Sequence, residues 1–143
     1  YELASWTAPN GIKLIPESSA LRVQHPNYSI RLVAAGGGLL ELKNQNGDTL
    51  LTDQRLRARS GSDKTIFDNL HDVNSNCSIR MIGDTLQLRF LSMLYSARRS
   101  TPGESATVFG MTTYHLNGSG TIRMRCEVFT DSMTYARGGA RRV

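Results

Sequence analysis

The stretch that decides the fold is TTYHLNGSGTIRMRCEVF, residues 112–129, near the C-terminal end of the sequence. Two alternating runs flank four small polar residues, 117–120, whose glycines tolerate the positive φ angles that tight hairpin loops require. A loop of two or of four residues sets Leu116 opposite Thr121. The segment is therefore predicted to form an antiparallel hairpin.

This register divides the hairpin into one apolar and one polar face, as expected of a half-buried antiparallel pair. The arginines of the second strand then face solvent. The predicted apolar pairs are His115 with Ile122, Met111 with Cys126 and Phe109 with Val128, and the polar pairs are Tyr114 with Arg123 and Thr112 with Arg125.

A second hairpin is predicted for CSIRMIGDTLQLRFL, residues 77–91, around a two-residue turn at Gly83 and Asp84. Its alternation gives another clean apolar face. The pairs expected on that face are Met81 with Leu86, Ile79 with Leu88 and Cys77 with Phe90.

The rest of the chain also favours strands, and no stretch has convincing helical periodicity. The fold class predicted is all-β, an antiparallel β-sandwich, with residues 1–19 as a lead-in or linker and 20–143 as the sandwich domain. Further strands are expected at LRVQH (21–25), YSIRLV (28–33), LLELK (39–43) and TLL (49–51), whereas 52–75, with short strand pieces, and 97–105 are expected to be loops.

Charge and composition exclude several classes of protein. The chain has 143 residues and a net charge of +5, and 14 of its 17 basic residues are arginine. Because these arginines are dispersed along strands, we predict no nucleic-acid partner; solvated strand faces, ion pairs and a polyanion site all remain open.

No apolar run reaches the roughly 20 residues of a membrane span, and no membrane partner is predicted. No signal peptide begins the sequence, so the compartment, periplasm and secretion included, stays open.

The two cysteines do not form a disulfide framework, and both Cys77 and Cys126 fall on the predicted apolar faces. They are expected to be buried thiols that pack as small hydrophobic side chains. The three histidines, at 25, 71 and 115, show no ligand spacing with them. We therefore predict neither a metal site nor a cofactor.

The order of several motifs resembles a known family. GGGLLELKNQNGDTLLTDQRL (36–56), a loop with FDNL (67–70) and then the hairpin at 112–129 resemble the C-terminal domain of glycoside hydrolase family 2 β-galactosidases. The resemblance spans roughly 20–132 and corresponds to the N-terminal half of that galactose-mutarotase-like "supersandwich". It implies a non-catalytic β-sandwich portion that packs on a separate catalytic barrel and helps to shape the sugar site.

The same resemblance suggests where a galactoside would be contacted. The loop 60–72 would border the sugar site, so Asp68, Asn69 and His71 are the candidate contacts, although Asp68 and Asn69 could equally cap a turn. Trp6 could stack on a pyranose or anchor the N-terminal segment to the core. The catalytic glutamates of the family lie on the barrel, and no acid pair stands out here as retaining glycosidases require. The chain alone is expected to be inactive.

Two other functions stay open: a free-standing carbohydrate-binding or protein-interaction module, and an arginine-driven polyanion binder. The oligomeric state depends on the two hairpins. If their apolar faces pack on each other, the chain is a compact monomeric sandwich, which we favour. If they require strands that this sequence lacks, an edge-to-edge homodimer is expected.

Overall fold

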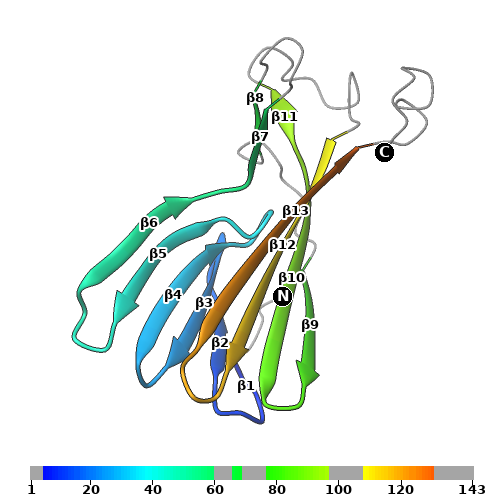
Figure 1. Ribbon diagram of the computed structural model, residues 1–143. Coiled ribbons are helices and arrows are strands. Elements are labelled where there is room, and N and C mark those ends of the chain that lie inside the picture. The colour runs from blue at the N-terminus through cyan, green and yellow to red at the C-terminus, as the bar shows by residue number, and fades with distance from the viewer. Residues whose placement is uncertain (1–4, 60–65, 69–76, 97–107, 131–143) are drawn as a thin grey trace.

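The computed structural model describes residues 5–59, 66–68, 77–96 and 108–130, and these ranges contain strands and no helix (Figure 1). Two antiparallel sheets pack face to face. The prediction of an all-β sandwich is confirmed.

The first sheet is a six-stranded meander in which each strand pairs with the next one along the chain. Its first two strands come from residues 1–19, which the sequence suggests as a lead-in, and Ile12 and Leu14 enter the core. The apolar run from 12 to 15 is too short for a periodicity signal. The strands are β1 (Trp6–Thr7), β2 (Lys13–Pro16), β3 (Ala20–His25), β4 (Tyr28–Val33), β5 (Leu39–Asn44) and β6 (Thr49–Gln54).

The second sheet has four strands in the order β13-β12-β10-β9. A small third sheet, in the order β11-β8-β7, includes two strands from the region expected to be a loop with short strand pieces. The bounds are β7 (Arg57–Arg59), β8 (Ile66–Asp68), β9 (Cys77–Ile82), β10 (Thr85–Met93), β11 (Tyr95–Ser96), β12 (Val108–Asn117) and β13 (Ile122–Thr130).

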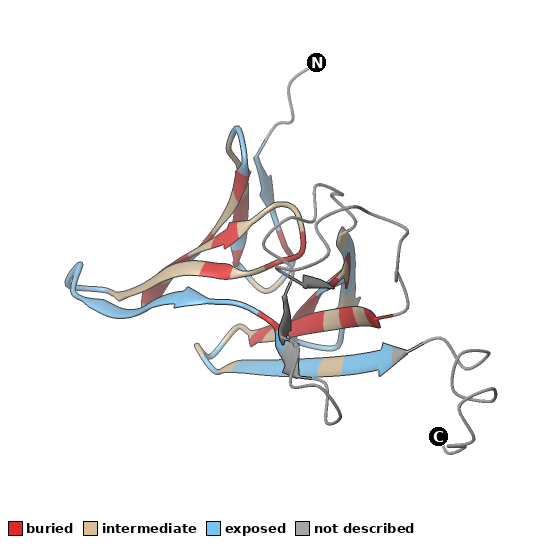
Figure 2. Ribbon diagram, turned by 90° about the horizontal axis from the view of Figure 1, so that it is seen from above, coloured by how far each residue is buried: buried red, intermediate tan, exposed pale blue. Residues whose placement is uncertain are grey.

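The core lies between the central strands of the two large sheets. Val23 and Ile30 of the first sheet and Leu88 of the second are at most 1 % exposed. Tyr114 crosses the interface, where its hydroxyl donates a hydrogen bond to the carbonyl oxygen of Gly37 at 2.7 Å. Its ring meets Phe90 edge to face, with centroids 6.1 Å apart. Figure 2 shows the buried residues on these inner strands and the exposed ones on β6 and β13.

The two predicted hairpins do not pack on each other, which corrects that expectation. They lie side by side in one sheet because β10 pairs with β12. Both apolar faces are turned toward the six-stranded sheet, which supplies the second layer of the sandwich (Figure 1). Six consecutive short strands together offer a wider apolar surface than one hairpin, and the sequence signals of the first two of them are weak.

The register predicted for the hairpin of residues 77–91 is confirmed. Met81 is opposite Leu86, Ile79 opposite Leu88, and Cys77 opposite Phe90. The turn has two residues, and Gly83 has a φ of 61°. A two-residue turn of this kind matches the twist of the flanking strands.

The register of the hairpin of residues 112–129 is shifted by one residue from the prediction. Leu116 is opposite Ile122, and the amide of Asn117 donates to the carbonyl of Thr121 at 3.2 Å, so the three residues 118–120 form the loop. The amide of Gly120 donates to the carbonyl of Asn117 at 3.1 Å, and Gly120 has a φ of 104°. This is a β-turn followed by a glycine with positive φ, the arrangement typical of three-residue hairpin loops. The prediction assumed a loop with an even number of residues. A loop with an odd number of residues shifts every cross-strand pair by one residue.

The shift inverts the faces of β12 relative to the prediction, because successive side chains of a strand point to opposite faces. Tyr114 and Thr112, expected outside, are buried in the sandwich. His115, expected inside, lies on the outer face opposite Arg123. The side of β13 is unchanged: Ile122 still faces inward.

The cysteines differ from the expected pair of buried thiols. Cys126 is exposed, and Cys77 is only partly buried. Burial raises the pKa of the Cys77 thiol to about 11. Both belong to one cross-strand row with Phe90 and Thr112 between them. Three strand spacings, about 14 Å, separate them, far beyond the reach of a disulfide.

Candidate functional site

Of the four residues predicted to contact sugar, the described part of the chain contains two. Asp68 ends β8, where its backbone pairs with Arg57 and Tyr95. Asn69 and His71 lie outside the described residues. Trp6 belongs to β1, far along the first sheet, and pairs with Leu14. The prediction of a shared contact loop is therefore not tested.

Trp6 borders a shallow hollow of about 400 Å³ that it shares with Ile79, Arg80 and Met81 of β9. Its side chain is 44 % exposed, although its partner Leu14 is in the core. The indole is thus held at the margin of the sandwich, where β1 and β9 face each other. A half-exposed indole can offer an apolar surface to a ligand.

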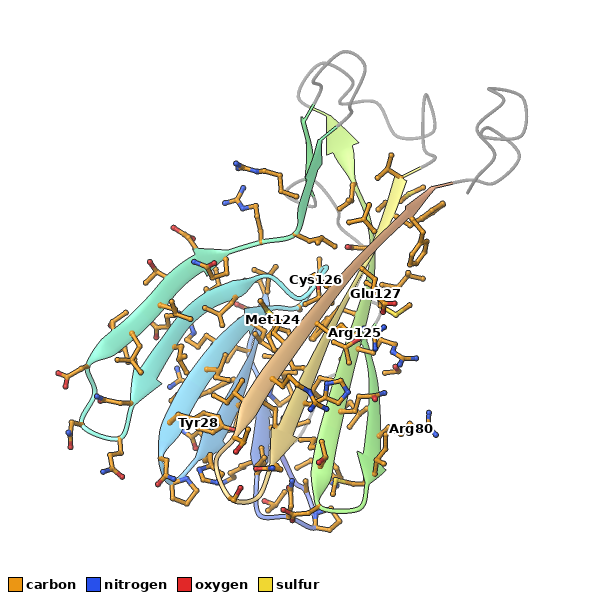
Figure 3. The ribbon with its side chains drawn as sticks, viewed as in Figure 1. Tyr28, Arg80, Met124, Arg125, Cys126 and Glu127 are labelled. Carbon is orange, nitrogen blue, oxygen red and sulfur yellow. The ribbon has the colours of Figure 1, made fainter. Side chains whose placement is uncertain are left out.

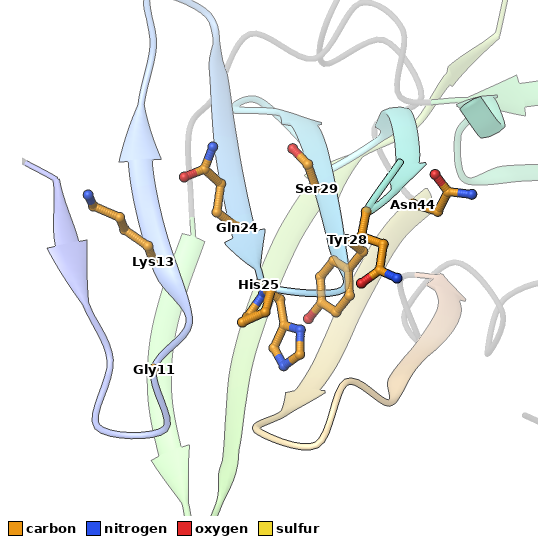
Figure 4. A pocket seen from close by; sticks show the side chains of 9 residues that line it. Gly11, Lys13, Gln24, His25, Tyr28, Ser29 and Asn44 are labelled. Carbon is orange, nitrogen blue, oxygen red and sulfur yellow. The ribbon is translucent and has the colours of Figure 1, made fainter. Parts of the chain in front are cut away.

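A second hollow, of about 420 Å³, lies at the turn between β3 and β4 (Figure 4). Lys13, Gln24 and Ser29 line it from neighbouring strands, and His25 stacks on Tyr28 at its end. The ring centroids are 4.9 Å apart and the planes differ by 7°. Lys13, Gln24 and Ser29 share one cross-strand row on the outer face of the sheet, whereas His25 and Tyr28 form the next row, which faces the interior of the sandwich.

Hydrogen bonds at both ring nitrogens fix the tautomer of His25. The amide of Asn27 donates to Nδ1 at 3.0 Å, so Nδ1 is an acceptor. Nε2 therefore carries the proton that it donates to the carbonyl oxygen of Gly118, 2.8 Å away. This contact ties the β3–β4 turn to the β12–β13 loop, which makes His25 a structural residue of the neutral form.

Tyr28 is the residue of this hollow that sequence reasoning missed. It is 6 % exposed, and its hydroxyl has no hydrogen-bond partner among the described residues. Burial raises its pKa to about 12, so the hydroxyl stays protonated at neutral pH. The signal in the sequence is the segment HPNY, a turn that places an aromatic residue directly after proline and asparagine.

The two large sheets have their other edge strands, β6 and β13, at the margin opposite β1 and β9. This margin of the sandwich is open. Leu51 continues the inner row that runs through Ile30 and Leu42, yet it is 47 % exposed. Met124 continues the row through Leu88 and Tyr114 and is 46 % exposed. We call this margin the open flank and define it by Leu51, Met124, Cys126 and Val128, whose side chains lie on inner faces without being buried.

Figure 3 shows Met124 and Cys126 along β13, at the edge of the sheet that faces β6. Between them and the first sheet lies a cavity of about 50 Å³, lined also by Gly38 and Leu56. So small a space holds no sugar. The open flank is an apolar surface suited to packing rather than a ligand pocket.

Glu17 is held by two arginines of neighbouring strands. Glu17 accepts hydrogen bonds from Arg22 at 2.9 Å and Arg31 at 3.2 Å. Its pKa is lowered, chiefly by the bond from Arg22, with Arg31 adding to the effect. A general acid of a glycosidase needs the opposite shift.

No protein-family model matches the chain, and no curated protein matches it significantly. Within the described ranges, no group of three or more His, Cys, Asp or Glu side chains is placed to hold a metal ion. The same ranges contain no helix long and apolar enough to cross a membrane.

Proposed function

We propose that this chain is a non-catalytic β-sandwich portion of a β-galactosidase-like glycoside hydrolase and that it packs on the catalytic part of that enzyme. One observation carries the proposal. The two hairpins that resemble the family, β5–β6 and β12–β13, lie on the two sides of the open flank.

The chemistry of the flank supports packing against another protein part. The inner rows remain apolar to their ends at Leu51 and Met124, and water contacts side chains that central strands would bury. Burying such a surface is favourable at about 25 cal/mol per Å².

Complementation tests this function. A family 2 β-galactosidase lacking the corresponding half of its C-terminal sandwich is co-expressed with the chain, and hydrolysis of an aryl β-galactoside is measured. We expect the chain to be inactive alone and to restore activity to the truncated enzyme. Turnover by the chain alone, or failure of the wild-type chain to restore activity, would contradict the proposal.

A matched pair of variants locates the contact. Leu51→Asp combined with Met124→Asp puts charge on the open flank, and we expect it to abolish complementation. Ile82→Asp combined with Leu91→Asp places the same number of charges on the outer face, where these side chains are 49 % and 37 % exposed, and should leave complementation intact. Equal loss in both variants would show that the flank is not the contact.

The hollow at Trp6 favours a second candidate function, a carbohydrate-binding module. Trp6 is the single tryptophan of the chain, so its fluorescence reports on this hollow alone. If a neutral galactoside stacks on the indole, titration should shift and enhance or quench the emission in a saturable way. If the emission stays unchanged up to a galactose concentration of one fiftieth of saturation, this candidate is excluded.

A further inference from the structure

The outer face of the four-stranded sheet carries four exposed arginines in two adjacent cross-strand rows. These side chains point away from the sandwich, on the side opposite Leu88 and Tyr114. The first row is Arg80, Gln87, His115 and Arg123, and the second is Ser78, Arg89, Thr113 and Arg125. We call the arginines of these two rows the arginine face.

The spacing of the sheet gives this face its dimensions. Neighbouring strands are about 4.8 Å apart, so Arg80 and Arg123 are separated by about 14 Å at their backbones. Arg123 and Arg125 are two residues apart on one strand, or about 7 Å. Figure 3 shows Arg80 and Arg125 on opposite edge strands of the sheet. The four guanidinium groups thus spread over a flat area rather than converging on a point.

Little within the described residues neutralises this charge. Glu127 lies 3.6 Å from the Arg125 guanidinium, and the Arg125 side chain in that pair is 69 % exposed, so the pair is weak. The other three arginines form no ion pair in the described part of the chain. On the first sheet, in contrast, Arg22 and Arg31 are both engaged by Glu17. Among the described residues, the arginines of the four-stranded sheet are therefore less neutralised than those of the six-stranded sheet.

His115 lies in the middle of the arginine face, where the positive charges of the arginines affect its pKa. Its pKa is lowered, first by burial and then by the charges of Arg123, Arg125 and Arg89. Its Nδ1 atom is buried and has no partner among the described residues. The lowered pKa favours the neutral imidazole at pH 7, which adds no charge to the face.

We propose that the arginine face binds an extended anionic polysaccharide, one that carries sulfate or carboxylate groups along its chain. The planar fork of arginine binds such groups with two parallel hydrogen bonds, which lysine cannot match. A flat set of cations about 14 Å across suits a polymer that presents several anions in succession. This inference is independent of the proposed function, because it concerns the outer face and not the open flank.

The aromatic side chains favour a glycan over single-stranded nucleic acid. A nucleic-acid surface interleaves cations with aromatic rings on which bases stack. The two rows of the arginine face contain no phenylalanine, tyrosine or tryptophan. Phe109 and Phe129 lie further along the outer face, beyond Glu127, and stack on each other with centroids 6.3 Å apart.

Binding to a labelled heparin octasaccharide tests the proposal, with a neutral galacto-oligosaccharide and a single-stranded oligonucleotide of similar length as comparisons. Arg123→Gln/Arg125→Gln removes two charges from the arginine face. Arg55→Gln/Arg57→Gln removes two exposed charges elsewhere and is the matched control. Thermal unfolding followed by circular dichroism verifies that both variants fold.

We expect the heparin octasaccharide to bind and the neutral glycan not to bind. The face variant should lose at least tenfold in affinity, and the control less than twofold. Affinity should fall steeply as salt rises, since the contacts are ionic. Equal losses in the two variants would show unspecific charge attraction and overturn the site. Tighter binding of the oligonucleotide would overturn the class of ligand.

Discussion

One hairpin of the four-stranded sheet has an even number of loop residues and the other has an odd number. This difference decides which side chains are opposite each other on the paired strands. The β9–β10 turn has two residues and keeps the register that alternation predicts. The β12–β13 loop has three residues, 118–120, and shifts the register by one. Because of this shift, Tyr114 enters the core and His115 joins the arginines outside. A glycine-rich loop can thus reassign a strand's two faces without changing the strand itself.

The largest expected effect tests which face of β12 is buried. Tyr114→Ala removes a ring that is 2 % exposed and its hydrogen bond to Gly37, and should lower the free energy of unfolding by about 3–5 kcal/mol. His115→Ala, one residue away on the outer face, should cost less than about 1 kcal/mol. Urea unfolding of both variants checks this. The reverse order of costs would support the even loop and contradict the observed register.

A smaller effect separates the two turns. Gly120→Ala forces a side chain to a φ of 104° and places Cβ 2.9 Å from the side-chain nitrogen of Asn27, so we expect a loss of about 2–3 kcal/mol. Gly83→Ala meets a φ of 61° with no atom within 4 Å and should cost about 1 kcal/mol. Thermal unfolding measures both. Equal costs would mean that the two turns impose the same strain.

The smallest expected effect is a dependence of stability on pH that comes from His115. Its pKa in the folded chain is lowered, so the unfolded chain binds the proton more readily. The stability that the neutral imidazole contributes is complete above the unfolded value of about 6.5 and is lost as pH falls through that value. His115→Gln should flatten this part of the stability curve between pH 7 and pH 5. An unchanged slope would contradict the assignment.

Much of the fold could be predicted from the sequence, because alternation and turn residues are local signals. The β9–β10 segment has apolar residues at every second position, so only one register satisfies it. The β12 segment has apolar or neutral side chains on both faces, and Tyr114 and Met111 are equally suited to burial. Alternation therefore could not choose between the registers. The hydrogen bond from Gly120 to Asn117, which sets the odd loop, has no distinct signature in the letters NGSG.

The candidate sites were less predictable, because they depend on strands that are distant in sequence. The exposure of Leu51 and Met124 follows from the positions of β6 and β13 at the same edge of the sandwich. The arginine face forms because β9 pairs with β10, and β12 pairs with both β10 and β13, so that all four strands belong to one sheet. The sequence shows dispersed arginines, and only the strand order shows that four of them share one surface.

The central claim is that the odd loop gathers His115 and the arginines on one outer face, and titration of His115 tests it most directly. Its imidazole pKa is measured by NMR in the wild-type chain and in Arg123→Gln/Arg125→Gln. We predict a value below that of an ordinary exposed histidine in the wild type, and a clear rise in the variant, because two of the charges that lower it are removed. A value that is the same in both proteins would place His115 away from these arginines and contradict the account.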